Sequence, residues 1–399
     1  MRCMTPWIVI FAMAGPGPIG VHADEPQADV PPAGRPRMTM MEASDADPLA
    51  TVERAARRQA ASARKPRNAA PAAKAAGPLA RDVSKAARQA AVVRGVRFLI
   101  AAQQGKDRGW GREAGRDDRS DVASASIAGL ALLKARPGDD VPERVGRERQ
   151  AAAFVARLVA ESKLPALWQP AVVDQTVIND LGTSADAALA TLFLAEHVAD
   201  DAGDDATECR AAVGLLLRHF DRRLQDEPGG FQKRAQGLSR AVLAHAAVVA
   251  ERAEVPVPEG LMGRLMDGCP AGPDLFGRAA RIGCLHAAGL QAGDRPTAET
   301  IDLADAAVRP LLSDYHGRWP YGAGGEVFLS LLFLGAMLGD AGGPTAAEWS
   351  RGVESQLVQA QNGDGSWTGS SCINSRVFCT STALLVMHAA PAADRVAAR

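Results

Sequence analysis

A chain of 399 residues with 47% hydrophobic and 23% charged residues can bury a core in one to three domains, which excludes a wholly disordered protein. The formal net charge of −1 excludes an overall charge bias toward polyanionic partners. Aromatic residues make up only 5%, and Ala and Leu dominate the apolar set. Because these residues favour helix over strand, we expect an all-α fold.

Residues 1–23 are typical of an export signal. Arg2 gives a positive start, residues 7–14 an apolar run, and residues 21–23 (VHA) a small-residue cleavage site. The apolar run is too short to span a bilayer, and no other stretch is long and apolar enough. We therefore predict a secreted or periplasmic protein without a transmembrane segment in its mature chain.

Residues 24–85 are rich in Ala, Pro, Arg and Ser and lack periodicity, which predicts a disordered spacer. Between Arg54 and Lys85, nine basic residues face one acidic residue, Asp82. This basic segment could touch an anionic surface. A solvated linker is the simpler interpretation because no aromatic residues interleave with the charges, so no nucleic-acid partner is expected.

From Ser84 onward, two kinds of helix alternate. The segment 345–361 is amphipathic: Thr345 and Glu348 form a capping box, and an apolar stripe follows at a spacing of four residues. Residues 376–389 are apolar on nearly every face, so that helix must be buried on most sides.

Pairing the two kinds of helix gives six hairpins. The amphipathic, outer members are 86–103, 147–162, 206–225, 259–268, 297–313 and 345–361, and the apolar, inner members are 121–135, 183–199, 236–252, 275–290, 322–338 and 376–390. Stacked hairpins form an open solenoid or a closed ring. Because the inner helices need neighbours on every side, we predict a single (α/α)6 toroid over residues 86–391, followed by a tail at 392–399.

The links from outer to inner helix carry a recurring motif. It is clearest at 103–111 (QQGKDRGWG) and 361–367 (QNGDGSW), with weaker copies at 225–231 (QDEPGGF) and 317–319 (GRW). Its glycines permit turns, its Asp and Gln bond backbone groups near helix ends, and its Trp covers the joint. We expect structural roles for five of its residues: Gln103, Trp110, Gln361, Asp364 and Trp367.

The pattern Q-x-x-D-G-x-W before a helix rich in small residues resembles the QW repeat of the terpenoid cyclase and protein prenyltransferase toroids. It is especially similar to the single-ring prenyltransferase/squalene oxidase repeat proteins that some bacteria export. The resemblance covers roughly residues 86–390 and is weak in the middle repeats. It implies an (α/α)6 ring with an apolar central funnel, which holds an isoprenoid in catalytic relatives, and structural rather than chemical roles for Gln361 and Trp367.

The catalytic sets of those relatives are missing from this sequence. The D-x-D-D acid of squalene-type cyclases is absent, and the chain is too short for their second ring. The D-x-C of the prenyltransferase zinc site is absent from the corresponding inner helix, and Cys379 stands where that site has its His. Neither cyclase nor zinc-dependent transferase chemistry is expected.

Cys372 and Cys379 leave three interpretations open. They could form a disulfide, as suits an oxidising compartment, or remain two buried thiols. They could also supply a reactive or metal-bound thiolate, because a helix N-terminus and Arg376 would lower a thiol pKa. Zinc needs about four ligands, and His388 lies too far along the helix to be an obvious third. We therefore predict no metal and no cofactor, with zinc as the least supported alternative.

Polar residues on the inner helices are candidates for a ligand-binding face, since buried charges are costly unless paired. The candidates are Asp121, Ser239, Arg240, His245 and Glu326. The competing interpretation makes most of them helix caps and dipole partners, with His245 as a hydrogen-bonded core histidine.

Three functions are compatible with these features. The first is a non-catalytic ring that binds an apolar small molecule, a peptide or a protein partner in its funnel. The second is an enzyme, transferase-like or cyclase-like, that uses Cys372, Arg376 and Cys379, or Glu326. The third is a carbohydrate-active enzyme, but the chain has only two tyrosines for an aromatic cleft. We expect the first.

Overall fold

The computed structural model describes residues 83–103, 108–111, 120–135, 141–162, 175–200, 205–226, 235–269, 272–313, 324–369 and 373–389. These residues lie in one compact unit, Ala73–Arg399. The predicted export signal (1–23), nearly all of the predicted spacer (24–85) and the predicted tail (392–399) lie outside the described residues.

The described part of the chain is all-α and contains no strand, as the composition predicts. The amphipathic helices are α2 (Lys85–Ala102), α4 (Glu143–Glu161), α7 (Asp205–Asp226), α9 (Leu261–Asp267), α11 (Ala298–Ser313) and α13 (Gly343–Ala360). The apolar helices are α3 (Val122–Lys134), α6 (Ala185–Asp200), α8 (Gln236–Arg252), α10 (Leu275–Ala292), α12 (Gly325–Ala341) and α14 (Arg376–Ala389). Each predicted helix is present, and a short one, α5 (Gln175–Leu181), was not predicted.

Side-chain caps begin several of these helices. Ser84 accepts a hydrogen bond from the backbone N–H of Ala87 at the start of α2, at 3.1 Å. Asp274 does the same for Gly277 at the start of α10, at 2.8 Å. These caps satisfy backbone donors that the first helical turn leaves unpaired.

The predicted capping box of Thr345 and Glu348 is wrong. Helix α13 begins two residues earlier, at Gly343, with Pro344 in its first turn and no side-chain cap. Proline suits that position because it lacks the N–H that a first turn leaves unpaired and its φ is already helical. The Thr345 hydroxyl instead donates to the Asp305 carboxylate of α11, at 3.1 Å.

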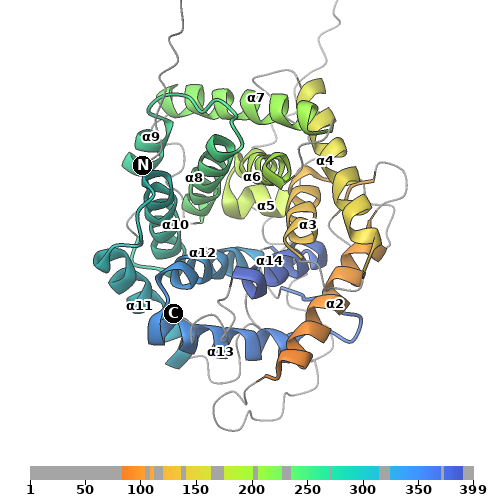
Figure 1. Ribbon diagram of the computed structural model, residues 1–399, viewed down its shortest axis with the longest axis vertical. Coiled ribbons are helices and arrows are strands. Elements are labelled where there is room, and N and C mark those ends of the chain that lie inside the picture. Colours follow the sequence, from red (N-terminus) through yellow and green to blue (C-terminus); the bar gives the residue numbers. More distant parts are fainter. Residues whose placement is uncertain are drawn as a thin grey trace, which may run out of the picture. The chain divides into compact units, whose positions relative to one another are not determined.

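The two kinds of helix differ in burial as their patterns predict. In α14, every residue from Val377 to Met387 is buried. In α13, burial is confined to one face, which carries Ala346, Trp349, Ser350, Val353, Ser355 and Leu357. The apolar helices α3, α6, α8, α12 and α14 lie inside the amphipathic helices (Figure 1).

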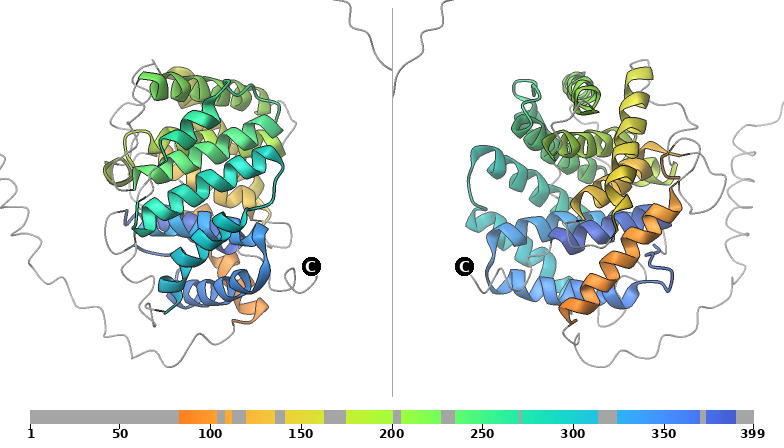
Figure 2. Two further views of the ribbon diagram at one scale, coloured as in Figure 1. Left: turned by 90° about the vertical axis from the view of Figure 1, so that its left-hand side faces the viewer. Right: turned by 45° about the vertical axis from the view of Figure 1, so that its right-hand side comes forward.

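The contacts between the apolar helices follow chain order and return to their start, and those between the amphipathic helices do so except between α9 and α11. Among the apolar helices, α3 contacts α6, α6 contacts α8, α8 contacts α10, α10 contacts α12, α12 contacts α14, and α14 contacts α3. Among the amphipathic helices, α2 contacts α4, α4 contacts α7, α7 contacts α9, α11 contacts α13, and α13 contacts α2. The first helix therefore packs against the last two, α13 and α14 (Figure 2).

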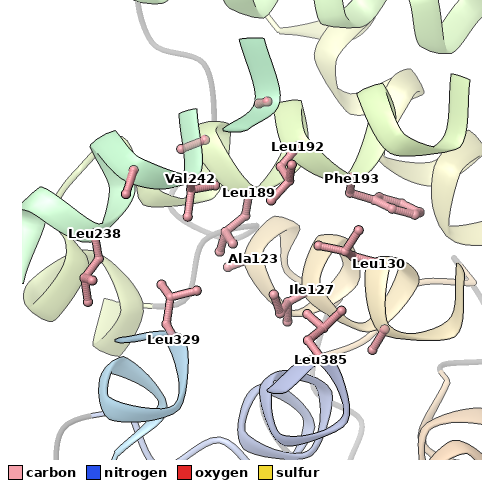
Figure 3. Packing of buried hydrophobic residues seen from close by; sticks show 14 of the residues in the cluster. Ala123, Ile127, Leu130, Leu189, Leu192, Phe193, Leu238, Val242, Leu329 and Leu385 are labelled. Atoms are coloured by element: carbon pink, nitrogen blue, oxygen red, sulfur yellow. The ribbon is translucent and has the colours of Figure 1, made fainter. Parts of the chain in front are cut away.

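The centre of this arrangement is apolar. Side chains from α3, α6, α8, α12 and α14 point toward one another, and those nearest the middle are Ala123, Ile127, Leu189, Leu238, Val242, Leu329 and Leu385 (Figure 3). All of them are buried. Small residues let the helices approach closely, since a Cβ at Gly283 would come within 2.8 Å of the Ala241 side chain. None of the described helices is long and apolar enough to cross a membrane.

Candidate functional site

The QNGDGSW motif of the last repeat lies between α13 and α14, against α2. The Gln361 amide donates to the backbone carbonyls of Ala91 (2.8 Å) and Gly365 (2.9 Å). Its oxygen accepts a hydrogen bond from Nε of Arg94, at 3.0 Å. Gln361 therefore joins the C-terminal end of α13 to α2.

Trp367 joins the same helices through its indole. The ring is buried, and its Nε1 donates to the carbonyl of Leu357 in α13, at 2.8 Å. Its backbone N–H donates to the Thr380 hydroxyl of α14, at 2.9 Å. Gly95 of α2 packs against the ring so closely that a Cβ there would come within 2.9 Å of it.

The first copy of the motif makes equivalent bonds one repeat away. The Nε1 of buried Trp110 donates to the carbonyl of Leu99, at 2.7 Å. The Gln103 amide donates to the carbonyls of Arg108 (2.7 Å) and Arg147 (3.2 Å) and accepts from the Arg147 guanidinium (3.1 Å). This Gln joins α2 to α4, just as Gln361 joins α13 to α2.

Gly365 and Gly363 in the last motif form a matched pair for a stability test. Gly365 has a φ of +90°, and a Cβ there would lie 2.5 Å from the Arg94 carbonyl oxygen. Gly363 has open space around it. We expect Gly365→Ala to lower the free energy of unfolding by more than about 1 kcal/mol, and Gly363→Ala to change it by less than about 0.5 kcal/mol, in denaturant titrations. Equal effects would contradict the close contact with α2.

Arg376, a predicted catalytic candidate, bonds to the motif itself. Its guanidinium pairs with the Asp364 carboxylate, donates from Nε to the Ser366 hydroxyl at 3.2 Å, and lies 5.1 Å from the centre of the Phe98 ring. Burial alone would raise the pKa of Asp364, but hydrogen bonds from Arg376 and Ser366 outweigh burial and lower it. The charged Arg376 side chain therefore stabilises the contact of the 361–367 loop with α14 and α2.

Cys379 is a buried thiol whose pKa is raised, not lowered. Burial raises the pKa to about 12, the Glu326 charge adds to the effect, and a backbone hydrogen bond at Gly369 opposes it. The helix-terminus argument for a reactive thiolate is therefore outweighed by desolvation. The thiol is free and donates weakly to the carbonyl of Ile373, at 3.5 Å. Cys372 lies outside the described residues.

Glu326 lies beside Cys379, in the first turn of α12. It is 5% exposed, and its carboxylate accepts a long hydrogen bond, 3.4 Å, from the backbone N–H of Ile373. The adjacent Gly325 donates to the carbonyl of Ile373, at 2.7 Å. The structure thus brings Glu326 and Cys379 together, while Arg376 is directed to Asp364.

Three other ligand-binding candidates, at the start of α3 and on α8, bond to the backbone. Asp121 caps α3 by accepting from the N–H of Ser124, at 2.6 Å. Ser239 donates to the carbonyl of Leu181, at 2.8 Å. Arg240 is fully buried and donates to two carbonyls in the last turn of α9, as a cation at a helix C-terminus does.

His245 occupies an aromatic contact between α8, α10 and α12. Its ring stacks on Phe333 with centroids 5.4 Å apart and lies 5.3 Å from the ring of His286. Burial, with the charge of His286, lowers the pKa of His245 to about 3, so the imidazole is neutral at physiological pH. A neutral imidazole among rings is a packing group rather than a proton donor.

Sequence reasoning missed a buried polar cluster between α4, α6 and α7. Nδ1 of His197 lies 2.7 Å from Oε1 of Glu148, and the two residues are 1% and 4% exposed. Burial alone would lower the pKa of His197, but hydrogen bonds with Cys209 and Glu148 raise it to about 10. The imidazole is therefore positively charged. The sequence carries one signal of this cluster: His197 is a histidine on a helix that is predicted to be buried on all faces.

Within the described residues, the side chains discussed above do not form a catalytic set. The buried Cys379 thiol lies near the Glu326 carboxylate, but its raised pKa keeps it protonated, and no three His, Cys, Asp or Glu side chains of the described segments are placed to hold a metal ion. In comparisons with known proteins, no family model, no curated protein and no solved structure matches this chain.

Proposed function

We propose that this chain is an exported (α/α)6 toroid of the terpenoid cyclase and prenyltransferase type that binds an apolar small molecule at its centre without chemical conversion. The observation that carries the proposal is the convergence of apolar side chains from five buried helices (Figure 3). The side chains labelled there include Leu189, Leu238 and Leu329, and all three are buried. An apolar ligand gains about 25 cal/mol for each Å² of surface that it removes from water there.

The order of helix contacts supports a closed ring. The last apolar helix contacts the first, and the last amphipathic helix contacts the first. Polar bonds reinforce this closure: Arg88 of α2 pairs with Glu354 of α13 at 2.9 Å and donates to the carbonyl of Met387 in α14. The two QW motifs add Gln and Trp bonds at equivalent joints. Export and the family rest on the signal-like residues 1–23 and on these motifs.

An enzymatic function has less support. It would rest on Cys372, Arg376 and Cys379, but the Cys379 thiol stays protonated and the Arg376 charge pairs with Asp364. A reactive thiol nucleophile needs a lowered pKa, whereas burial and the charge of the neighbouring Glu326 raise the pKa of Cys379. The same residues serve well as supports for the last joint of the ring.

The proposal is tested with 1-N-phenylnaphthylamine, a neutral apolar fluorophore, and with native mass spectrometry of the chain purified from its host. We expect saturable fluorescence at about one probe per chain, and displacement of any co-purifying lipid by the probe. Leu329→Trp, which enlarges a side chain at the centre, should weaken probe binding at least tenfold. The matched control Val145→Trp, at a side chain that is 43% exposed, should leave binding unchanged.

Two results would overturn the proposal. One is a wild-type chain that neither carries a lipid nor binds the probe saturably. The other is a folded Leu329→Trp variant, checked by circular dichroism, that binds the probe as tightly as the wild type. The measurement on the wild type does not depend on any variant. The ligand-binding proposal can therefore be overturned even if Leu329→Trp does not fold.

A further inference from the structure

Two histidine rings from neighbouring apolar helices lie in contact. The rings of His245, in α8, and His286, in α10, have their centres 5.3 Å apart. Each ring has one buried nitrogen that finds no hydrogen-bond partner among the described residues: Nε2 of His245 and Nδ1 of His286. Buried polar atoms of folded proteins are nearly always paired, and an unpaired one points to a bound water or ion. Two such nitrogens on touching rings therefore indicate a shared binding partner.

The Asp340 carboxylate determines which nitrogen of His286 carries the proton. Oδ2 of Asp340, in α12, lies 2.9 Å from Nε2 of His286. A carboxylate accepts hydrogen bonds and does not donate them, so Nε2 carries the hydrogen. In the neutral ring, Nδ1 then has a lone pair and no hydrogen. This arrangement, with a carboxylate on one nitrogen and a lone pair on the other, is the one that metal-binding histidines have.

The His245 ring is held in place by packing and is uncharged. It stacks on the Phe333 ring of α12, with centres 5.4 Å apart and an angle of 29° between the planes. Burial, with the charge of His286, lowers the pKa of His245 to about 3. The ring therefore keeps a nitrogen lone pair at physiological pH, and a metal ion binds the neutral form of imidazole. Both rings thus meet the chemical requirement of a metal ligand.

The separation of the two rings fits a tetrahedral ion. Two imidazoles bound to one tetrahedral zinc ion through bonds of about 2.0–2.1 Å have their ring centres about 5 Å apart. A linear arrangement with the same bonds would place the centres about 6 Å apart. The observed 5.3 Å is closer to the tetrahedral value. Imidazole nitrogens suit zinc and its neighbours in the first transition row, whereas calcium and magnesium prefer oxygen ligands.

We propose that His245 and His286 bind one zinc ion, through Nε2 and Nδ1 respectively, and that Asp340 positions His286. No third His, Cys, Asp or Glu of the described segments is placed to complete the coordination, so water molecules take the remaining positions. The His245 side chain is partly exposed, which leaves a route for solvent and the ion. The inference is independent of the proposed ligand-binding function, because its test requires no apolar ligand.

The test uses the full chain, stripped of metal with a chelator, kept reduced, and titrated with Zn²⁺ in competition with the chromophoric chelator 4-(2-pyridylazo)resorcinol. We expect the wild type to bind one ion per chain more than the double variant His245→Gln/His286→Gln. The cysteines are the same in both chains, so zinc on thiols does not enter this difference. Zinc should also raise the midpoint of thermal unfolding of the wild type and not that of the double variant, because an ion that binds only the folded chain stabilises it.

Asp340→Asn tests the positioning role without removing a ligand. The amide oxygen can still accept from Nε2 of His286, but the negative charge behind the ring is lost, so zinc should bind about tenfold to a hundredfold more weakly. The matched control is His219→Gln, at a partly exposed histidine of α7 outside this cluster. That variant should bind zinc as tightly as the wild type.

A measurement on the wild type alone keeps the proposal testable if the histidine variants do not fold. Co²⁺, which replaces zinc, should give the strong visible absorption of a four-coordinate site at one ion per chain, and added Zn²⁺ should abolish it. The proposal is overturned if the wild type shows no such band. It is also overturned if a folded His245→Gln or His286→Gln chain, checked by circular dichroism, binds zinc as tightly as the wild type.

Discussion

Glu148→Gln is expected to lower the free energy of unfolding by about 3 kcal/mol near neutral pH, one of the two largest effects in this protein. The Glu148 carboxylate stabilises the positive charge of His197, which is almost completely buried. Oε1 of Glu148 lies 2.7 Å from Nδ1 of His197. Glutamine has nearly the same shape, so the variant removes the charge and leaves the packing. His197 must then give up its proton or remain an uncompensated buried cation. Urea titration measures the loss.

The pH dependence separates this electrostatic effect from a packing defect. The pKa of His197 is about 10 when folded and 6.5 as the reference for the unfolded chain. Because the folded pKa is the higher one, this stabilisation is complete below pH 6.5 and is lost as pH rises from 6.5 toward 10. Each pH unit in that window removes about 1.4 kcal/mol.

The wild type and Glu148→Gln should therefore converge in stability as pH rises from about 6.5 to 9. The control is Glu143→Gln, an exposed residue in the first turn of the same helix, which should cost less than about 1 kcal/mol at every pH. Parallel stability curves for the wild type and Glu148→Gln would show that His197 is not charged in the folded chain.

Trp367→Ala is expected to have the second large effect and to lower the free energy of unfolding by about 3–5 kcal/mol. The indole is 1% exposed, contacts Gly95 of α2 and donates to Leu357 of α13, so its removal leaves a cavity where three helices meet. Trp367→Phe keeps most of the apolar surface and loses the hydrogen bond, so it should cost about 1–3 kcal/mol.

Hydrogen exchange shows whether Trp367 fastens the first helix to the last two. In Trp367→Ala, the amides of α2 and α14 should exchange faster, while those of α6 and α8, which Trp367 does not touch, should change little. Trp110→Ala, at the equivalent joint between α2 and α4, should instead loosen α2 and α4. A uniform increase over all helices in both variants would contradict a local role at each joint.

Most helices were predictable because burial imposes a pattern on the sequence. A helix exposed on one side keeps a stripe such as Trp349, Val353 and Leu357, and a helix enclosed on all sides becomes apolar all round, as α14 does. Helix α5, of seven residues, was not predicted. The start of α13 was misplaced because Pro344 sets the first turn more strongly than the Thr345 capping signal.

The candidate site was predictable only in part. The motif at 361–367 has a second clear copy at 103–111, so the joints that the two copies form could be expected from Gln361 and Trp367. The chemistry assigned to Cys379 could not be judged without its surroundings, since the same helix position lowers a thiol pKa when exposed and raises it when buried. Arg376 seemed available for catalysis because its partner, Asp364, lies twelve residues away in a loop.

The sequence by itself therefore determined the all-α class, the alternation of helices and the QW joints, because these depend on local propensity, periodicity and repetition. The tertiary structure alone decided which distant polar groups meet. Glu148 and His197 are 49 residues apart, and Arg240 of α8 donates to the backbone carbonyls of Arg264 and Leu265 in α9. No local pattern encodes such contacts, because they arise from the packing of separate helices.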